Sequence, residues 1–381
     1  MIGRTDATGD GPVMNEKNAI VAGRWSANQP DTAKGFFGFP PLRRHLIELS
    51  FGPEAAERQW QNRWWAEDLV AEQFLDGGEG IRTVLSLCCG FGVVEQHFVE
   101  SFPVVEHCLG VDIADGALRA ARLSAESRGL DRVIEYRLAD VNTFPWPEIA
   151  YDLVVASGAL HHLAGLRGVL EGVGRALRPG GVLYANEHVG ARHLAHSPRQ
   201  VELINAVALI VPPELRVRSP FPFSRRTGFT RLLALAGGSL RLCPQKERGA
   251  WPVWKKGLAR VVDGMQALAP AGGTPVGQVY IPDPTGLQRR DPSESVSAPD
   301  ILPLVGEFFE DVTILPYGGG VLRYALDEGF YDGFDPDNSR HEEVLSLVCT
   351  IERTLMECGE LGPEHAIIIA RRPRYRSTPV R

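Results

Sequence analysis

The stretch Val84–Gly92, which reads VLSLCCGFG, passes from an apolar run through two adjacent cysteines to a pair of glycines. The apolar run has the length of a buried strand, and a helical pattern begins at about Val93. Gly90 and Gly92 let the backbone turn tightly and approach a ligand, and the first turn of the helix offers free N–H groups. A strand–turn–helix unit of this kind is typical of sites that hold a carboxylate, ribose or phosphate group.

Strand and helix patterns alternate along much of the chain. The expected strands are 83–88, 106–111, 133–138, 151–156, 181–187, 311–315 and 365–370. The expected helices are 54–75, 93–101, 115–128, 163–177, 197–211, 300–309 and 341–358. Because strands joined by single helices pair in parallel through right-handed crossovers, we predict an α/β fold. Its centre should be a doubly wound, seven-stranded, mostly parallel sheet, interrupted by a mixed lid insertion.

The composition argues against several classes of protein. No run of about 18 apolar residues is present, so no transmembrane helix is expected, and the N-terminus lacks the apolar core of a signal peptide. Six cysteines occur without a C-x-x-C pair, which argues against a disulfide framework and a structural zinc site. We therefore expect a cytoplasmic protein without membrane contact and without a metal site.

Polar side chains follow the second, third and fourth expected strands. Asp112 and Ile113 end the second strand, Asp140 follows the third, and Ser157 follows the fourth. Because the carboxyl ends of parallel strands meet at one edge of a sheet, we expect these residues to border one crevice. Asp112 is placed to accept hydrogen bonds from ribose hydroxyls, and Asp140 to accept one from an adenine amino group.

Five segments together resemble the motifs of class I S-adenosylmethionine-dependent methyltransferases, in particular bacterial enzymes of the small-molecule type. They are VLSLCCGFG, GVDIADGAL, LADVNTF, YDLVVASGALHHL and LRPGGVLYANEHVG. The resemblance covers roughly residues 80–190, and about 310–372 fits the final strands of that family. It implies a Rossmann-like methyltransferase fold with S-adenosylmethionine as the cofactor.

The resemblance also assigns residues to the cofactor. Gly90 and Gly92 should face the methionine moiety and the ribose, whose diol Asp112 should hold. Asp140 and Val141 should hold adenine, and the serine after the fourth strand should line the methyl-transfer channel. The complete cofactor set is Ser86, Cys88, Cys89, Gly90, Gly92, Asp112, Ile113, Asp140, Val141 and Ser157.

Two positions depart from the family pattern V-L-D/E-L-G-C-G-x-G. Ser86 stands where the family often has an acid that positions the cofactor's amino group, and Cys88 stands where its first glycine lies. A Cβ at Cys88 would weaken binding if the backbone there needs a positive φ. We interpret Cys88 and Cys89 as packing residues of the turn, with a redox or nucleophilic thiol as the alternative.

The catalytic candidates are His162, His161 and Glu187, which lie just beyond strand ends. Methyl transfer requires an aligned acceptor, and a hydroxyl acceptor benefits from a general base, for which histidine is suited near pH 7. One of the two histidines is expected to be a core residue, and Glu187 is alternatively a loop cap. A metal site of His161, Glu187 and His188 is not favoured. Weaker candidates for contact with an acceptor are Tyr280, Arg289, Arg290 and Glu294.

The 381 residues divide into five segments. They are a flexible N-terminus (1–30), an N-terminal helical segment (31–80), a cofactor-binding core (81–190), a basic lid or substrate insertion (191–300) and the C-terminal part of the sheet (301–381). Within residues 191–290, fifteen side chains are basic and five are acidic, whereas the whole chain has a net charge of −7. This asymmetry favours an anionic partner, and a solvated basic face is the alternative.

We therefore predict an S-adenosylmethionine-dependent methyltransferase that acts on a small-molecule acceptor, such as a sugar or a specialised metabolite. The basic insertion favours an anionic acceptor. A nucleic-acid or protein methyltransferase is the first alternative. Against a nucleic-acid partner, the sequence after the fourth expected strand reads ASGALHH, where enzymes that methylate amino groups of nucleic acids have a different motif. A nucleic-acid partner is therefore not expected. A non-catalytic cofactor-binding protein is the second alternative. A homodimer remains open.

Overall fold

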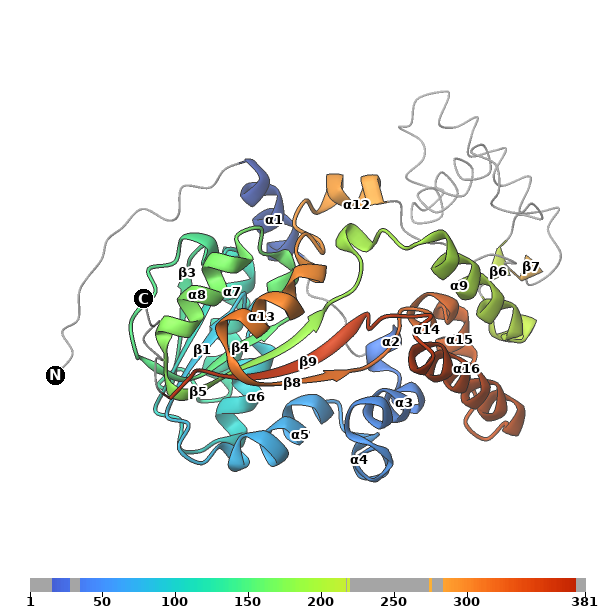
Figure 1. The fold of residues 1–381 in the computed structure, drawn as a ribbon, viewed down its shortest axis with the longest axis horizontal. Coiled ribbons are helices and arrows are strands. Elements are labelled where there is room, and N and C mark those ends of the chain that lie inside the picture. Colours follow the sequence, from blue (N-terminus) through green and yellow to red (C-terminus); the bar gives the residue numbers. More distant parts are fainter. Residues whose placement is uncertain (1–15, 28–34, 217, 220–273, 276–283, 375–381) are drawn as a thin grey trace, which may run out of the picture.

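The computed structural model describes residues 16–27, 35–216, 218–219, 274–275 and 284–374, and a seven-stranded sheet lies at its centre (Figure 1). The strands are β1 (Thr83–Leu87), β2 (His107–Asp112), β3 (Ile134–Leu138), β4 (Tyr151–Ser157), β5 (Leu177–His188), β8 (Glu310–Pro316) and β9 (His365–Arg371). Their order is β3-β2-β1-β4-β5-β9-β8; the first five pair in parallel, and β9 is antiparallel to β5 and β8. The predicted doubly wound α/β fold is confirmed. A separate two-stranded sheet pairs β6 (Arg218–Ser219) with β7 (Thr274–Pro275).

Helices cover both faces of the large sheet (Figure 1). They are α1 (Glu16–Ala27), α2 (Gly35–Gly38), α3 (Pro40–Phe51), α4 (Pro53–Gln59), α5 (Trp65–Phe74), α6 (Val93–Ser101), α7 (Asp115–Ser127), α8 (Leu166–Ala176), α9 (Pro198–Ile210), α12 (Pro284–Arg290), α13 (Ile301–Phe308), α14 (Leu322–Ala325), α15 (Glu328–Gly333) and α16 (Ser339–Glu357). Within β1, Val84 belongs to one buried apolar cluster, and Leu85 and Leu87 belong to the other. Burial on both faces explains why the parallel strands read as continuous apolar runs.

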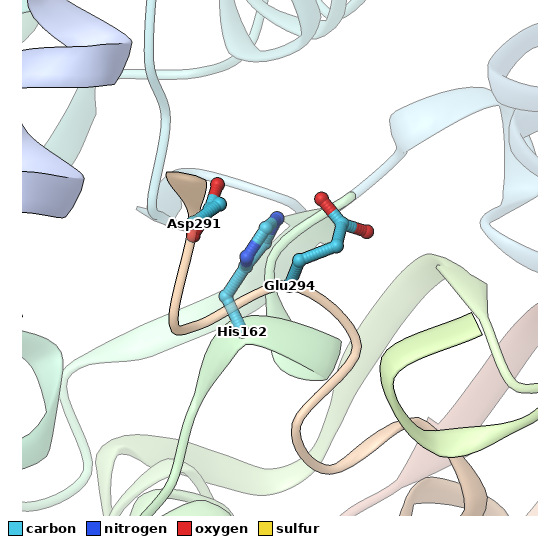
Figure 2. Close-up of side chains that lie close together, drawn as sticks. All are labelled: His162, Asp291 and Glu294. Atoms are coloured by element: carbon cyan, nitrogen blue, oxygen red, sulfur yellow. The ribbon is translucent and has the colours of Figure 1, made fainter. Parts of the chain in front are cut away.

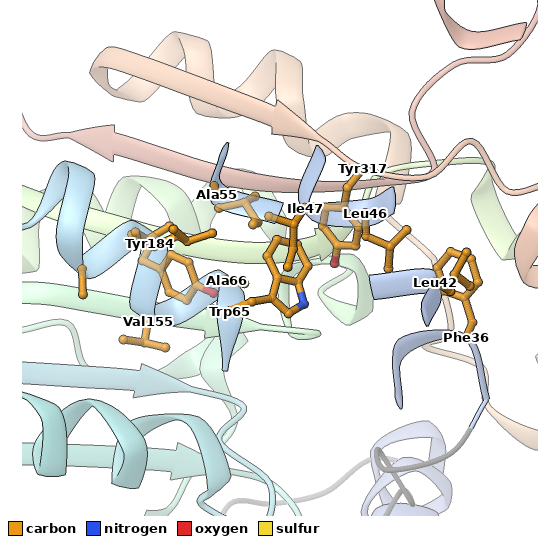
Figure 3. Packing of buried hydrophobic residues seen from close by; sticks show 14 of the residues in the cluster. Phe36, Leu42, Leu46, Ile47, Ala55, Trp65, Ala66, Val155, Tyr184 and Tyr317 are labelled. Atoms are coloured by element: carbon orange, nitrogen blue, oxygen red, sulfur yellow. The ribbon is translucent and has the colours of Figure 1, made fainter. Parts of the chain in front are cut away.

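The larger cluster joins the N-terminal helices to the end of the sheet. Figure 3 shows Trp65 of α5 lying between Tyr184 of β5 and Tyr317, which follows β8. The rings of Trp65 and Tyr317 meet edge to face with centroids 5.5 Å apart. The Tyr184 hydroxyl donates to the buried carboxylate of Glu67 at 3.0 Å. These contacts hold the carboxyl end of β5 and the turn after β8 in fixed positions.

The single helix expected over 54–75 is instead the two helices α4 and α5. Asn62 lies between them, and its side-chain oxygen accepts the Trp64 N–H at 2.9 Å. Its side-chain nitrogen donates to Asp68 at 2.7 Å. An asparagine that bonds to nearby backbone in this way competes with the helical ladder, which explains the break.

Residues 16–27 form α1, whereas the sequence analysis expected a flexible N-terminus. The helix packs on α7, where the Gly116 N–H donates to Ser26 Oγ at 3.1 Å. A Cβ at Gly116 would collide with Ser26, so the two helices approach closely because this residue is a glycine. Tertiary packing of this kind stabilises a helix whose own sequence carries only a weak pattern.

The basic insertion is described in four parts: 191–216, 218–219, 274–275 and 284–300. The helix expected at 197–211 is confirmed as α9, and Tyr280 lies outside the described residues. Within the described ranges, no helix combines the length and the apolar character that crossing a membrane requires.

Candidate functional site

The turn after β1 is held by Asp112 at the end of β2. The Gly90 N–H donates to Asp112 Oδ2 at 2.8 Å, and the Ala114 N–H donates to Asp112 Oδ1 at 2.7 Å. Burial raises the pKa of Asp112, and these backbone hydrogen bonds oppose that effect. Each carboxylate oxygen keeps a second lone pair, so Asp112 can still accept a bond from a ligand hydroxyl.

The two glycines of the turn have different surroundings. Both have positive φ, +54° at Gly90 and +76° at Gly92. Apart from the adjoining residues, no described atom lies within 4 Å of the position that a Cβ at Gly90 would take, whereas a Cβ at Gly92 would collide with the Tyr136 hydroxyl. Gly90 therefore presents an open face that fits the approach of a ligand. Gly92 is required for close packing against β3.

Cys88, which stands at the position of the first glycine of the motif, adopts the left-handed conformation with φ of +48°. A non-glycine residue in this region is strained by about 1 kcal/mol. Burial raises the pKa of the Cys88 thiol, and the charges of Asp112 and Glu187 raise it further. Burial, together with the charge of Glu95, also raises the pKa of Cys89. Since the reactive form of cysteine is the thiolate, these surroundings support packing roles for both residues.

Glu95 of α6 places a carboxylate beside Ser86, where the motif usually has an acid. Ser86 Oγ donates to Glu95 Oε2 at 3.1 Å, and both residues are buried. Burial raises the pKa of Glu95 to about 7. Its Oε1 atom has no hydrogen-bond partner among the described residues. Glu95 was not among the predicted site residues, although its spacing of three and four from Phe98 and Val99 places all three on the buried side of α6.

Asp140 follows β3 and is held by asparagines. Its Oδ1 atom accepts from the backbone N–H and the side-chain nitrogen of Asn142 at 2.9 and 2.8 Å. Its Oδ2 atom accepts from Asn18 Nδ2 of α1 at 2.8 Å. The side-chain amide of Asn18 therefore donates to the carboxylate that we expected to accept a hydrogen bond from an adenine amino group. Val141 is buried next to this carboxylate, and Ile113 and Ser157 are half-buried at the neighbouring strand ends.

His161 and Glu187 form a buried pair where β4 and β5 end. Both histidines, His161 and His162, lie in the short 3₁₀ turn η3 (Leu160–His162), and the helix that we expected from residue 163 begins after this turn, at Leu166. Glu187 Oε1 accepts from the backbone N–H groups of Ala159 and Leu160 at 2.8 and 2.7 Å, and Oε2 lies 2.7 Å from His161 Nδ1. Glu187 is thus a loop cap and a partner of His161 at once.

The surroundings of the two adjacent histidines shift their pKa values in opposite directions. Burial alone would lower the pKa of His161, but the hydrogen bond and charge of Glu187, with the charge of Glu294, raise it overall. Burial, with the charge of His161, lowers the pKa of His162 to about 4. The His162 ring meets Trp25 of α1 edge to face, with centroids 5.6 Å apart. Glu187 and Glu294 therefore favour the protonated form of His161, whereas burial and the charge of His161 favour the neutral form of His162.

The loop after α12 brings acidic residues to His162. Figure 2 shows the His162 ring between the carboxylates of Asp291 and Glu294. One ligand atom from each of these three residues lies within 4.8 Å of the other two. The same loop places Glu294 Oε1 3.9 Å from His161 Nε2. Arg289 and Arg290 are exposed on α12.

A further polar cluster lies beyond His161, at the ends of β5 and β9. The His161 and His188 ring centroids are 5.9 Å apart, and those of His188 and His365 are 5.3 Å apart. Arg323 Nη1 lies 3.1 Å from His365 Nε2. Burial lowers the pKa of His188 to about 3, and the charge of His161 contributes to that shift. Neither ring nitrogen of His188 has a hydrogen-bond partner among the described residues, nor does Glu364 Oε1.

Residues 84–181 match a family model described as a methyltransferase domain. The demethylmenaquinone methyltransferase of Thermus thermophilus is 32% identical over 139 residues, which are 36% of this chain and 57% of that protein. A sterol 24-C-methyltransferase of Gibberella zeae is 30% identical over 114 residues, 29% of this chain and 30% of that protein. The chain spans about half the length of the first curated relatives it matches. A crystal structure of a methyltransferase from Aquifex aeolicus aligns with 46% of this chain and 77% of that chain, at 16% identity and a TM-score of 0.32.

Proposed function

The chain contains a class I S-adenosylmethionine-dependent methyltransferase domain, and we propose that the whole protein transfers a methyl group to a small-molecule acceptor. The matched relatives include proteins named for a demethylmenaquinone and for a sterol, both of which are small molecules. When bound, S-adenosylmethionine supplies a methyl group already activated by a sulfonium charge. The protein's main task is then to hold the acceptor in line and to take up a proton.

The described residues at the turn after β1 fit that cofactor. Gly90 leaves open space for a ligand, and Asp112 keeps lone pairs for ribose hydroxyls. The Oε1 atom of Glu95 is a candidate acceptor for the amino group of the methionine moiety, in competition with the Tyr136 hydroxyl, which interacts with the same carboxylate. Asp140 would hold adenine if the amide of Asn18 yields its place.

The observation that carries the catalytic proposal is the pair of His161 and Glu187. Because Glu187 accepts at 2.7 Å from His161 Nδ1, the proton of the neutral ring is held on Nδ1 and the lone pair on Nε2. Nε2 can then take the proton of an acceptor hydroxyl or ammonium group at the end of β4. Glu187 stabilises the imidazolium that forms, as a buried carboxylate does for the base of a catalytic triad.

Arg323 supports an anionic acceptor. Among the described residues, the guanidinium of Arg323 has a polar contact with His365, and no carboxylate lies within ion-pair distance of it. A guanidinium without a carboxylate partner suits a carboxylate or phosphate group of a ligand. The polar cluster of His188, His365 and Glu364 lies around it and is short of hydrogen-bond partners.

Formation of S-adenosylhomocysteine in the presence of a panel of hydroxyl- and carboxylate-bearing small molecules tests the proposal. We expect turnover with at least one acceptor class, and a fall of about 100-fold or more in kcat for His161→Asn. His107→Asn, an exposed histidine at the start of β2, is the matched control and should behave like the wild type. Cofactor binding without turnover across the panel would favour a non-catalytic protein. Turnover only with nucleic acid or protein would overturn the small-molecule assignment.

The anionic character of the acceptor has its own test. For an acceptor found in the panel, KM should rise with ionic strength, and Arg323→Gln should raise KM more than it lowers kcat. A KM that is independent of salt and of Arg323 would remove the anionic part of the proposal and leave the methyl transfer standing.

A further inference from the structure

The cluster of His162, Asp291 and Glu294 combines residue types that bind metal ions. His162 comes from the turn after β4, and the two acids come from the loop after α12, about 130 residues later in the sequence. Their ligand atoms lie within 4.8 Å of one another, so a small closing movement of the side chains would bring them to the distances at which three residues share one ion. Figure 2 shows the imidazole flanked by both carboxylates.

A hydrogen-bond chain orients the His162 ring for such a role. Ser293 Oγ donates to Asp291 Oδ1 at 2.6 Å, so its single proton is used there. The contact of 3.0 Å between His162 Nδ1 and Ser293 Oγ must then have the ring as the donor. The proton of the neutral ring is therefore on Nδ1, and Nε2 carries the lone pair. Histidine ligands of metals are held in this way by a donor bond from their second nitrogen.

The two carboxylates lack a full set of partners. Asp291 is fully buried, and its Oδ2 atom accepts no hydrogen bond among the described residues. Arg24 Nε of α1 lies 3.2 Å from that oxygen, an ion pair without hydrogen-bond alignment. Glu294 is 18% exposed and accepts from Ser295 Oγ at 3.1 Å. Arg24 thus balances the charge of Asp291, whereas Glu294 forms no ion pair with an arginine or lysine among the described residues, so a cation between the two acids would be favourable.

We propose that His162, Asp291 and Glu294 bind a divalent metal ion, through Nε2 of His162 and one oxygen of each carboxylate. One nitrogen and two oxygen donors suit a first-row ion such as Mn²⁺, and three protein ligands leave coordination positions open. A bound oxygen of the acceptor could occupy one of them, because Glu294 also lies beside His161. That role rests on the proposed function, whereas metal binding itself does not.

The test is a titration of the full-length protein with Mn²⁺ alone, followed by the loss of the electron paramagnetic resonance signal of the free ion. We expect saturable binding of one ion to the wild type and binding at least about tenfold weaker for His162→Gln and Glu294→Gln. Ser293→Ala, which removes only the orienting hydroxyl, should weaken binding by about tenfold. Glu307→Gln, an exposed acid paired with Arg167, is the control and should bind like the wild type.

Thermal unfolding with and without Mn²⁺ separates metal binding from damage to the fold. The ion should raise the Tm of the wild type and of Glu307→Gln but not that of Glu294→Gln, whose partly exposed side chain makes it the variant least harmful to folding. Absence of Mn²⁺ binding by the wild type would overturn the proposal and leave Arg24 as the counter-charge of Asp291. Equal affinity in the wild type and in Glu294→Gln would overturn it as well. Titration with S-adenosylmethionine reports separately on the proposed function.

Discussion

The edge of the sheet has two halves that are built in different ways. The half at β1, β2 and β3 contains Asp112 and Asp140, whose partners are backbone N–H groups and asparagines. The half at β4, β5 and β9 contains four histidines with acids and an arginine around them, and several of their atoms have no hydrogen-bond partner in the part of the chain that the structure describes. The first half is a nearly complete hydrogen-bonded frame, whereas the second retains unused donors and acceptors. This difference is what a fixed cofactor and a variable acceptor would require.

The largest effect is expected at Asp112, the centre of the first half. Asp112→Ala removes the acceptor of both the Gly90 and the Ala114 N–H groups as well as the ribose contact. Two charge-assisted hydrogen bonds are worth a few kcal/mol, so affinity for S-adenosylmethionine should fall about 100-fold or more by calorimetry. Circular dichroism should show a folded variant. Unchanged affinity would show that Asp112 does not bind the cofactor, and the two halves of the sheet edge would then not divide into a cofactor half and an acceptor half.

Glu187→Gln probes the second half and should have the next largest effect. The amide can accept fewer of the bonds from the turn and from His161, which should cost about 2–3 kcal/mol in denaturant unfolding. The groups that face His161 are Glu187, Glu294, His162, His188 and Arg323.

The pH dependence of this variant has a definite sign. The folded pKa of His161 is raised, so its contribution to stability is present below the ordinary histidine pKa and is lost as pH rises through the folded value. The stability difference between the wild type and Glu187→Gln should therefore shrink from pH 6 to pH 9. Nuclear magnetic resonance titration should show a lower pKa of His161 in the variant. An unshifted His161 would contradict the pairing.

These two residues also show what the sequence could and could not reveal. Asp112 lies in a contiguous motif, where strand pattern, glycines and a terminal acid define its place, and the fold followed from the same pattern. The partners of His162 lie about 130 residues away along the chain and meet it only through the loop after α12. Nothing in the local pattern around Asp291 predicts that contact, because it depends on tertiary packing.

Helix α1 and Glu95 were missed for related reasons. The weakly patterned N-terminal helix is held by contacts with Gly116 and Asp140 rather than by its own propensity. Glu95 carries its carboxylate on a helix, whereas the family motif has the acid on the strand at Ser86. The spacing of Glu95 from Phe98 and Val99 could have predicted its position on the buried side of α6, but not its hydrogen bond with Ser86.

Glu95→Gln tests whether this carboxylate belongs to the cofactor half. The folded pKa of Glu95, about 7, lies above the ordinary value of 4.5, so the wild type should lose stability as pH rises from 4.5 to 7. The variant should lack that loss and should be more stable than the wild type at pH 8, by about 1–2 kcal/mol in urea unfolding. Its affinity for S-adenosylmethionine should fall at the same pH. Higher stability with unchanged affinity would make Glu95 a purely structural acid.

The smallest effect is expected at Cys88. Cys88→Gly removes the strain of a positive φ and should stabilise the protein by about 1 kcal/mol, with a slightly higher affinity for the cofactor. Cys88 packs against the smaller apolar cluster and Cys89 against the larger one, so Cys89→Gly is the matched control that removes packing without relieving a positive φ, and it should destabilise the protein. If both substitutions destabilise equally in thermal unfolding, the left-handed turn at Cys88 is not a source of strain.

The measurement that tests the account most directly is a calorimetric titration of the wild-type protein with S-adenosylmethionine and S-adenosylhomocysteine. The arrangement of Gly90, Glu95 and Asp112 leads us to expect saturable binding of one molecule of either ligand with micromolar affinity. Absence of binding to both ligands would mean that Ser86 and Cys88 have made the turn after β1 unfit for the cofactor, and it would contradict the proposed methyl transfer.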